Sequence, residues 1–465
     1  MGGRYLIVSD LHLCDVEDHA DGWKAYKSSR YVWDAAFAEL LARVEARGEG
    51  PLTLVLNGDI IDFDLVSDVP ESPAWPVRQT ERLRGLDPSE PKSVWKLERV
   101  LSHHADFLRT LAGFVERGND IVYVMGNHDR EFHFPAVQRV LSDAIRAAGA
   151  ADGRVLPESV VRFEPWFFHV EGEVYCEHGQ QYDHYNSFRH LLEPTIPNLH
   201  GDRVIALPMG NLSNRYLLGR MGFFNPHASD FILNLYAYIV HWLKHYAFSR
   251  HRGIFLNWFF GSLAVIWKLL EIKAQLLREP SDDPALLAAH AAHSGLTVPQ
   301  LESLAELQHR PITDRFFLVI REFWIDRVII ATLMTLGTIA LAVTPIPLWT
   351  KLTVPLMGFP LVYAIYEWIV HGGTIFDVEH HMPAVARAIA RKLGVRVVSF
   401  GHVHKPRLVA VDRGVLYADT GTWAPIMDRT RPDCLATGYR NYLSVDFSGG
   451  PDPIVDFGSW IPPGG

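Results

Sequence analysis

The chain has 465 residues and a formal net charge of −9 at pH 7. Because one hydrophobic core rarely grows to this size, we expect two regions. The acidic balance argues against a protein that binds long nucleic acid through a global basic field, so we expect no nucleic-acid partner. The 3 cysteines are too few for a disulfide framework and favour a reducing compartment.

The first part of the chain alternates between strand and helix patterns. Apolar, β-branched runs predict strands at Arg4–Asp10, Leu52–Asp59 and Asp120–Asp129, followed by a hairpin over Val161–Gly179. Helical periodicity between them predicts helices at Trp33–Val44, Val94–Val115 and Pro135–Ala147. The N-terminal MGGRYLIVSDLHL enters a strand at once and lacks the apolar segment of a signal peptide. We therefore expect the polar residues at these strand ends to stay in the cytoplasm.

Between about residues 186 and 376 the strand signals vanish and apolar helical runs replace them. These runs are Phe231–Leu243, Ile254–Trp267, Val328–Thr350 and Leu352–Tyr366. No charged residue interrupts the third run, which is long enough to cross the hydrocarbon core of a bilayer. Pro345 and Pro347 predict a tight turn between the last two runs. We therefore predict an all-α apolar insertion over residues 186–376.

Strand signals return after the insertion, at Val395–His404, Gly414–Trp423 and Tyr442–Phe447. Since residues i and i+2 of a strand share one side, His402 and His404 should project together. Strands alternating with helices and then clustering predict a layered α/β domain. We expect this domain to be split between residues 1–185 and 377–465.

Almost every predicted strand of the α/β part ends in residues that bind metals. These ends are Asp10-Leu-His12, Asn57-Gly58-Asp59, Gly126-Asn127-His128-Asp129, His178-Gly179 and Gly401-His402-Val403-His404. In open α/β sheets, sites form beyond the carboxyl ends of the strands, so these distant segments should meet. Carboxylate, imidazole and amide donors suit Mn, Fe, Zn or Ni, among which we favour Mn.

The candidate donors are too many for one ion. They are Asp10, His12, Asp59, Asn127, His178, His402 and His404. Two divalent ions about 3.5–4 Å apart can share a carboxylate, bridge a water, lower its pKa and clamp a phosphoryl oxygen.

The order D-x-H, G-D, G-N-H-D, H-G, G-H-x-H resembles the calcineurin-like metallophosphoesterase superfamily. The resemblance implies a two-sheet β-sandwich flanked by helices, a dinuclear metal centre, and hydrolysis of a phosphate ester or pyrophosphate by a metal-bridged hydroxide. It also implies a division of the donors between the two ions. Asp10, His12 and His404 would hold the first metal, Asn127, His178 and His402 the second, and Asp59 would bridge them.

The same resemblance implies a catalytic role for the G-N-H-D segment. His128 would protonate the leaving oxygen or stabilise phosphoryl charge, and Asp129 would orient it. Arg130 and Lys405 directly follow motifs and are candidates to touch substrate phosphate, with ordinary surface charge as an equal alternative.

Within the superfamily, SDLHL together with an apolar insertion resembles the UDP-2,3-diacylglucosamine pyrophosphohydrolases. That resemblance implies a lipid-linked substrate and work at the cytoplasmic face of the inner membrane. The insertion would form a hairpin with both ends on one side. A re-entrant hairpin, an oligomer interface and buried helices of a soluble cap remain alternatives, as do a soluble phosphodiesterase or nucleotidase and a membrane scaffold with a non-catalytic metal site.

Overall fold

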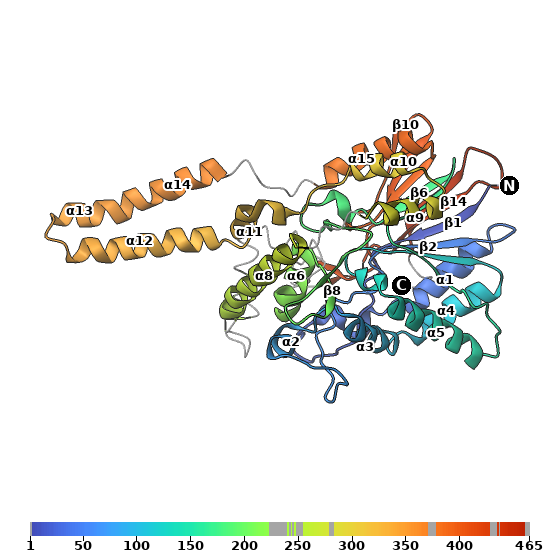
Figure 1. The fold of residues 1–465 in the computed structure, drawn as a ribbon, viewed down its shortest axis with the longest axis horizontal. Helices are drawn as coiled ribbons and strands as arrows, with labels where there is room; N and C mark the ends of the chain where they lie inside the picture. Colours follow the sequence, from blue (N-terminus) through green and yellow to red (C-terminus); the bar gives the residue numbers. More distant parts are fainter. Residues whose placement is uncertain are drawn as a thin grey trace.

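Two β-sheets lie face to face, and helices cover their outer surfaces (Figure 1). The computed structural model describes residues 2–222, 240, 243, 246–247, 254–278, 283–370, 378–427, 435–436 and 438–460. Most of the predicted helical run Phe231–Leu243 lies outside the described residues.

The first sheet has six strands in the order β15-β14-β1-β2-β3-β4. Strands β1 to β4 pair in parallel, while β14 and β15 add antiparallel strands at the other side of β1. The bounds are Arg4–Val8 (β1), Thr53–Asn57 (β2), Asp120–Val124 (β3), Arg162–Glu164 (β4), Asn441–Asp446 (β14) and Ile454–Ser459 (β15). The first strand of the chain therefore lies between the second strand and one of the last.

The second sheet has five strands in the order β10-β11-β9-β6-β5, with β6, β9 and β11 parallel. The bounds are Phe167–Val170 (β5), Val174–Glu177 (β6), Val397–Phe400 (β9), Arg407–Asp412 (β10) and Val415–Asp419 (β11). Short pairs form apart from both sheets, with bounds Thr195–Pro197 (β7), Arg203–Ile205 (β8), Ile426–Met427 (β12) and Leu435–Ala436 (β13).

Alternating side chains explain why β1 is buried on both faces. Tyr5 and Ile7 pack against the second sheet, in a cluster that includes Val397. Leu6 and Val8 point the other way, into the larger core formed with the helices. The period-2 pattern thus places one apolar layer between the sheets and another under the helices. The predicted α/β class with a two-sheet sandwich is confirmed.

Helices from both halves of the chain flank the sandwich. Their bounds are Asp34–Glu45 (α1), Gln79–Arg84 (α2), Glu90–Leu101 (α3), Ala105–Glu116 (α4), Pro135–Ala151 (α5) and Val378–Leu393 (α15). The single helix predicted over Val94–Val115 is wrong, because α3 ends and α4 begins around His104. His104 has a non-helical backbone (φ −127°, ψ 46°), and its ring bonds Asp34 Oδ1 at 2.9 Å. The predicted hairpin over Val161–Gly179 is also divided, since β4 joins the first sheet and only β5 and β6 pair.

The predicted insertion contains the β7–β8 pair and a series of helices. The helix bounds are Met209–Tyr216 (α6), Ile254–Leu276 (α8), Pro284–Ser294 (α9), Val298–Ala305 (α10), Phe316–Glu322 (α11), Ile325–Val343 (α12), Leu348–Thr353 (α13) and Phe359–Val370 (α14). Helix α6 is not peripheral, because its Asn211 and Arg215 are 0% and 2% exposed. Strand signals were missed at β7 and β8, which are only three residues long.

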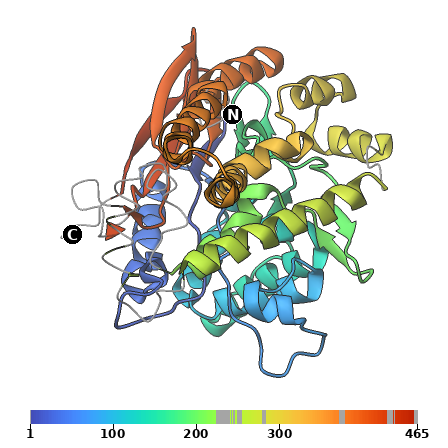
Figure 2. The same ribbon diagram turned by 90° about the vertical axis from the view of Figure 1, so that its left-hand side faces the viewer.

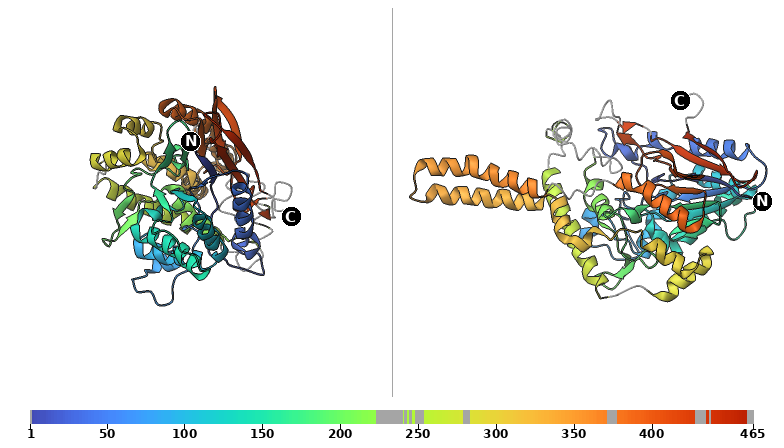
Figure 3. Two further views of the ribbon diagram at one scale, coloured as in Figure 1. Left: turned by 90° about the vertical axis from the view of Figure 1, so that its right-hand side faces the viewer. Right: turned by 90° about the horizontal axis from the view of Figure 1, so that it is seen from above.

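Helices α12, α13 and α14 form a hairpin that projects away from the body (Figures 1 and 3). The turn falls at Thr344–Pro347, where prolines were expected to place it. By length and composition, Ile325–Val343 and Leu348–Ile369 are candidate membrane spans, and none of their residues is buried. The alternative that these helices are buried in a soluble cap is therefore wrong.

An ionic and aromatic clasp joins the two legs of the hairpin at its root. The Arg327 guanidinium donates to both carboxylate oxygens of Glu367, at 2.7 and 3.0 Å. It also lies over the rings of Trp324 and Tyr366, at 5.4 and 6.0 Å from their centroids. A bidentate contact of this kind fixes orientation as well as distance, so the legs leave the body as one unit.

Candidate metal centre

Five strand ends deliver the predicted donors to one edge of the two sheets. The donor loops follow β1, β2 and β3 in the first sheet and β6 and β9 in the second. Each strand is an apolar run that enters the core, and each loop begins where the apolar residues stop. The parallel arrangement places these ends at the same edge, as expected for α/β sheets.

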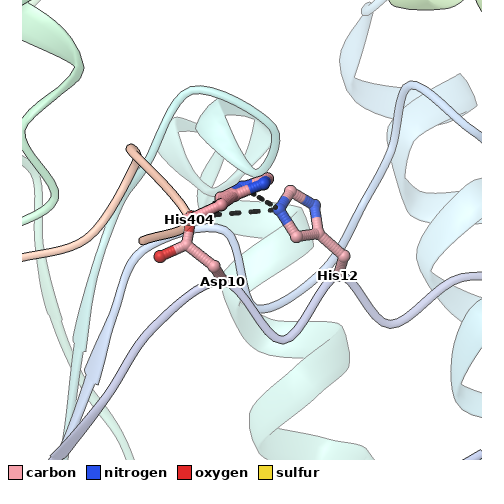
Figure 4. Close-up of side chains that lie close together, drawn as sticks. All are labelled: Asp10, His12 and His404. Atoms are coloured by element: carbon pink, nitrogen blue, oxygen red, sulfur yellow. Dashed lines mark hydrogen bonds and ion pairs between the residues drawn. The ribbon is translucent and has the colours of Figure 1, made fainter. Parts of the chain in front are cut away.

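Asp10, His12 and His404 form the first cluster (Figure 4). The Nε2 atoms of His12 and His404 are 3.1 Å apart, and His404 Nε2 is 3.1 Å from Asp10 Oδ1. His12 Nδ1 donates to Asp62 Oδ2 at 3.0 Å, which leaves Nε2 to face the cluster. This carboxylate–imidazole pair is the arrangement that orients metal-binding histidines.

Asp59, His178 and His402 form the second cluster, with ligand atoms within 4.8 Å of one another. His178 Nε2 lies 3.0 Å from Asp59 Oδ2 and 4.0 Å from Asp10 Oδ1, so it links the two clusters. Its Nδ1 donates to the carbonyl oxygen of Asn57 at 3.0 Å, which again leaves Nε2 facing the cluster. His402 Nε2 is 3.0 Å from Asp183 Oδ2.

The amide of Asn127 fits a metal ligand. Its Oδ1 is buried without a hydrogen-bond partner among the described residues, while its Nδ2 donates to Asn211 Oδ1 at 3.2 Å. A buried oxygen of this kind normally has a partner. Asn211 also donates to Asp64 Oδ2 and to the Asn127 carbonyl oxygen, at 2.6 and 2.9 Å. Because Asn211 accepts the hydrogen bond from Asn127 Nδ2, it orients the amide so that Asn127 Oδ1 points away from Asn211 and is available as a metal ligand.

Backbone geometry brings the carboxylates close to neighbouring loops. The backbone N–H of His128 donates to Asp59 Oδ1 at 2.8 Å, and that of His402 donates to Asp10 at 3.1 Å. A Cβ added at Gly126 would collide with Asp59, and one at Gly401 would collide with Asp10. Only glycine allows this approach at both positions.

Five donor residues have left-handed backbone conformations, which non-glycine residues rarely adopt. They are Asp10 (φ 53°), His12 (φ 49°), Asp59 (φ 55°), His402 (φ 72°) and His404 (φ 60°). Such conformations cost free energy and persist at functional sites when the surroundings enforce them. His402 and His404 lie beyond the end of β9, so they do not project together as strand residues would. One joins each cluster.

The histidines differ in the protonation state that their surroundings favour. Burial lowers the pKa of His12, which favours the neutral imidazole that binds metals. Burial also acts to lower the pKa of His178, but Asp59 and Asp10 outweigh it and raise that pKa to about 10. For Asp59, burial acts to raise the pKa, while His178 and His128 bring it below its ordinary value. The carboxylates of Asp59 and Asp10 thus favour a positive charge at this position, either a proton on His178 or a bound cation.

Residues 3–220 match the sequence model of the calcineurin-like phosphoesterase family. The chain carries a calcineurin-like phosphoesterase domain. No curated protein matches the chain. The family and the Asp/His clusters together indicate a metal-dependent phosphoesterase that uses divalent metal ions. The match reaches beyond residue 186, the predicted start of the insertion, and includes α6.

The phosphoesterase domain holds His128 in a way the sequence did not predict. His128 Nδ1 lies 3.3 Å from Asp62 Oδ2 and 3.3 Å from Asp64 Oδ2. Burial acts to lower the pKa of His128, but Asp62 and Asp59 raise it well above its ordinary value. His128 therefore favours the protonated form, which can donate a proton.

The prediction that Asp129 orients His128 is wrong. Asp129 instead accepts hydrogen bonds from Tyr123 Oη at 2.6 Å, Gly126 N at 2.6 Å and Ile60 N at 2.8 Å. Its carboxyl group turns back into the protein and ties the loops after β2 and β3 together. Asp129 thus fixes the loop that carries His128 without touching its ring.

The prediction that Arg130 contacts substrate is also wrong. Arg130 is 0% exposed, and its guanidinium donates to the carbonyl oxygens of Pro165 and Leu191. The side chain points away from the centre because these carbonyls and the ring of Phe188 surround it. Lys405 forms an ion pair with Glu379 at 2.9 Å and is 40% exposed in its side chain, so substrate contact stays a prediction for it.

Several site residues were missed by sequence reasoning. They are Asp62, Asp64, Asp183, Asn211 and Arg215. Asp62 and Asp64 closely follow Asp59 in the segment GDIIDFD, so this acidic segment could have indicated further carboxylates at the site. Arg215 bridges the buried carboxylates of Asp64 and Glu131, at 2.8 Å to each. Its helix carries no recognisable motif, so nothing in the sequence indicated it.

We predict that Asn211→Leu weakens metal binding by about 10–100-fold, as loss of a residue that orients a ligand does. The substitution removes the acceptor that holds Asn127 while keeping similar volume. Competition of the purified protein with a chelating dye measures the affinity. Ser213→Ala on the same helix is the control, because Ser213 Oγ bonds only Met209 O. Equal affinity in Asn211→Leu and wild type would contradict this role.

We predict that metal-free His404→Gly is more stable than His404→Ala by about 1 kcal/mol, because only glycine tolerates the left-handed backbone. Urea denaturation in chelator measures both free energies of unfolding. At the exposed position Arg109 in α4, the order should reverse, since glycine weakens a helix. If alanine is the more stable replacement at both positions, the backbone at His404 is not strained.

Proposed function

We propose that the chain is a two-metal hydrolase that cleaves a phosphate ester or pyrophosphate bond in a lipid-linked substrate at the cytoplasmic face of the cell membrane. The observation that carries the hydrolase part is the meeting of the Asp10–His12–His404 and Asp59–His178–His402 clusters beside His128, whose ring lies 3.3 Å from two buried carboxylates. The relation to the UDP-2,3-diacylglucosamine pyrophosphohydrolases is part of this proposal. A set of oxygen and nitrogen donors without thiolate suits Mn, Fe, Zn or Ni, and the proposal takes Mn as the metal.

In this proposal each cluster holds one metal ion. Asp10, His12 and His404 hold one, and His178, His402 and Asn127 hold the other, with Asp59 between them. When bound, the cations supply Lewis-acid chemistry: they lower the pKa of a water and neutralise charge on the phosphoryl oxygens.

His128 acts as the general acid. Asp62 and Asp64 hold its Nδ1, while its Nε2 lies on the opposite side, 3.5 Å from Asn214 Nδ2. As the oxygen of water bonds to phosphorus and the bond to the leaving oxygen breaks, the leaving oxygen takes the Nε2 proton of His128. The attacking water keeps one proton on the new P–O–H group or phosphate and releases the other to solvent, and His128 regains a proton from solvent, so that one water is added across the bond.

The exposed hairpin supports the membrane part of the proposal. Its two legs have the length and composition of membrane spans and no buried residue. Two crossings of the membrane would keep both halves of the phosphoesterase domain on the same side of the bilayer. Arg321, Arg327 and Lys273 lie near the root, which suits a cytoplasmic placement.

We predict that His128→Gln lowers turnover of a generic aryl phosphate by about 10²–10⁴-fold in the presence of Mn²⁺, the usual contribution of a general acid. Although His128 lies in a group with His12 and Asp62 that could hold an ion, the proposal gives it the role of proton donor, so metal content, measured by elemental analysis, should stay unchanged. His103→Gln, an exposed histidine between α3 and α4, is the control. Equal, negligible turnover in wild type and His128→Gln would instead favour a non-catalytic scaffold.

We predict that replacing residues 325–370 by a short flexible linker leaves aryl phosphate turnover unchanged, because no residue of either leg is buried in the body. The same variant should lose turnover of a phosphorylated lipid presented in vesicles. Both rates are compared with those of the full chain. Full turnover of nucleotides with none of any lipid substrate would show a soluble nucleotidase and remove the lipid part of the proposal.

A further inference from the structure

Helix α8 carries a continuous apolar stripe on its outer face. The stripe consists of Phe260, Leu263, Trp267, Leu270, Ala274 and Leu277, all exposed. Their spacing alternates between three and four residues, so they lie on one side of the helix. Trp267 and Leu277 are 65% and 72% exposed. An outward apolar face of this length is uncommon on a soluble protein and marks a contact surface.

The opposite face of α8 is already used for packing. Ser262, Val265 and Leu269 are at most 1% exposed, and a Cβ at Gly261 would meet Leu217 at 2.9 Å, just beyond the end of α6. Surface helices normally pair one apolar face with one polar face. Helix α8 has two apolar faces, and among the residues that the structure describes only the inner one is covered.

Helix α8 lies on the side of the body from which the hairpin projects. In Figure 2 the hairpin points toward the viewer, and α8 runs across the front of the body beside its root. Phe317 on α11 and Trp324 at the start of α12 are 87% and 51% exposed near the same root. Lys273 Nζ donates to the Thr313 carbonyl oxygen at 3.0 Å, which fixes the end of α8 beside the segment that leads into α11.

We propose that the outer stripe of α8 lies in the headgroup–acyl boundary of the bilayer that receives the hairpin. A helix held across the root of an inserted hairpin lies in the plane of the membrane surface. Interfacial helices of this kind bury their apolar face about 5–10 Å into the boundary. Lys273 and Arg278 near the end of α8 can extend to the headgroups while their stems stay on the apolar surface.

This inference rests on the proposed function and narrows its substrate class. Helix α6 packs between α8 and the metal centre, where its Asn211 contacts Asn127 and its Arg215 contacts Asp64. One helix layer therefore separates the bilayer surface from the residues that surround His128. The substrate is then a phosphorylated amphiphile that stays in the membrane, with its phosphate at or just above the headgroups.

Depth measurement by spin labelling tests the placement of α8. The full chain carries single cysteines at Leu263→Cys, Trp267→Cys, Leu336→Cys or Ile454→Cys, with its native cysteines replaced by alanine. It is reconstituted into phosphatidylcholine–phosphatidylglycerol vesicles. Collisions of each nitroxide with oxygen and with a polar nickel complex report its depth. Retained metal content and aryl phosphate turnover show that each variant is folded.

We expect the labels at residues 263 and 267 to lose nickel accessibility and gain oxygen accessibility relative to residue 454. Ile454 on β15 is a matched control, because it is 71% exposed and belongs to the six-stranded sheet. The label at residue 336, in the middle of α12, should be the deepest. If residue 336 is deep but residues 263 and 267 remain open to nickel, the α8 inference fails and the hairpin anchor stands.

Other outcomes overturn the inference differently. If residue 336 is also open to nickel, the membrane part of the proposed function fails together with the α8 inference. Spin–spin broadening at residue 267 that grows with protein density would show a second copy on the stripe, which also overturns it. As a second measurement, Trp267→Glu should reduce turnover of a vesicle-borne phospholipid while leaving aryl phosphate turnover unchanged, and an unchanged lipid rate would count against the inference.

Discussion

Two buried carboxylates, Asp10 and Asp59, set the main constraint on this structure. Both are at most 1% exposed, and the negative charge of Asp59 opposes ionisation of Asp10. Backbone N–H groups of His402 and His128 and the ring of His178 supply the partial and full positive charge that offsets them. An uncompensated buried charge would cost several kcal/mol. The loops must therefore close on these carboxylates, and the left-handed backbones and glycines follow from that requirement.

The fold and the donors were predictable where local sequence determines them. Each donor loop follows a short apolar strand, so parallel pairing alone brings Asp10, Asp59 and Asn127 to one edge. The role of Asp129 was not predictable, because Tyr123 and Ile60 take up its oxygens through contacts that only the packed loops create. Asn211, Arg215 and the burial of Arg130 depend likewise on tertiary packing. The break at His104 depends on Asp34, which is distant in sequence.

The two regions expected from length are not independent in the structure. The segment that looked like the start of an insertion supplies α6, whose Arg215 pairs with two buried carboxylates next to His128. The metal-dependent phosphoesterase domain is thus incomplete without it. The hairpin differs, because its legs contact each other through Arg327 and Glu367 and bury nothing in the body. Within the predicted insertion, α6 completes the metal centre, whereas the hairpin of α12 to α14 stays outside it.

The strand order constrains how the chain is completed during synthesis. Strand β1 leaves the ribosome first, yet one of its two neighbours is β14, separated from it by more than four hundred residues. His402 and His404 also emerge late, after the apolar hairpin has been translated. The nascent N-terminal part of the chain must therefore wait with an open sheet edge and with five of its seven donors. The apolar hairpin thus leaves the ribosome while the centre still lacks two of its donors, and the site can close only after the hairpin has been made.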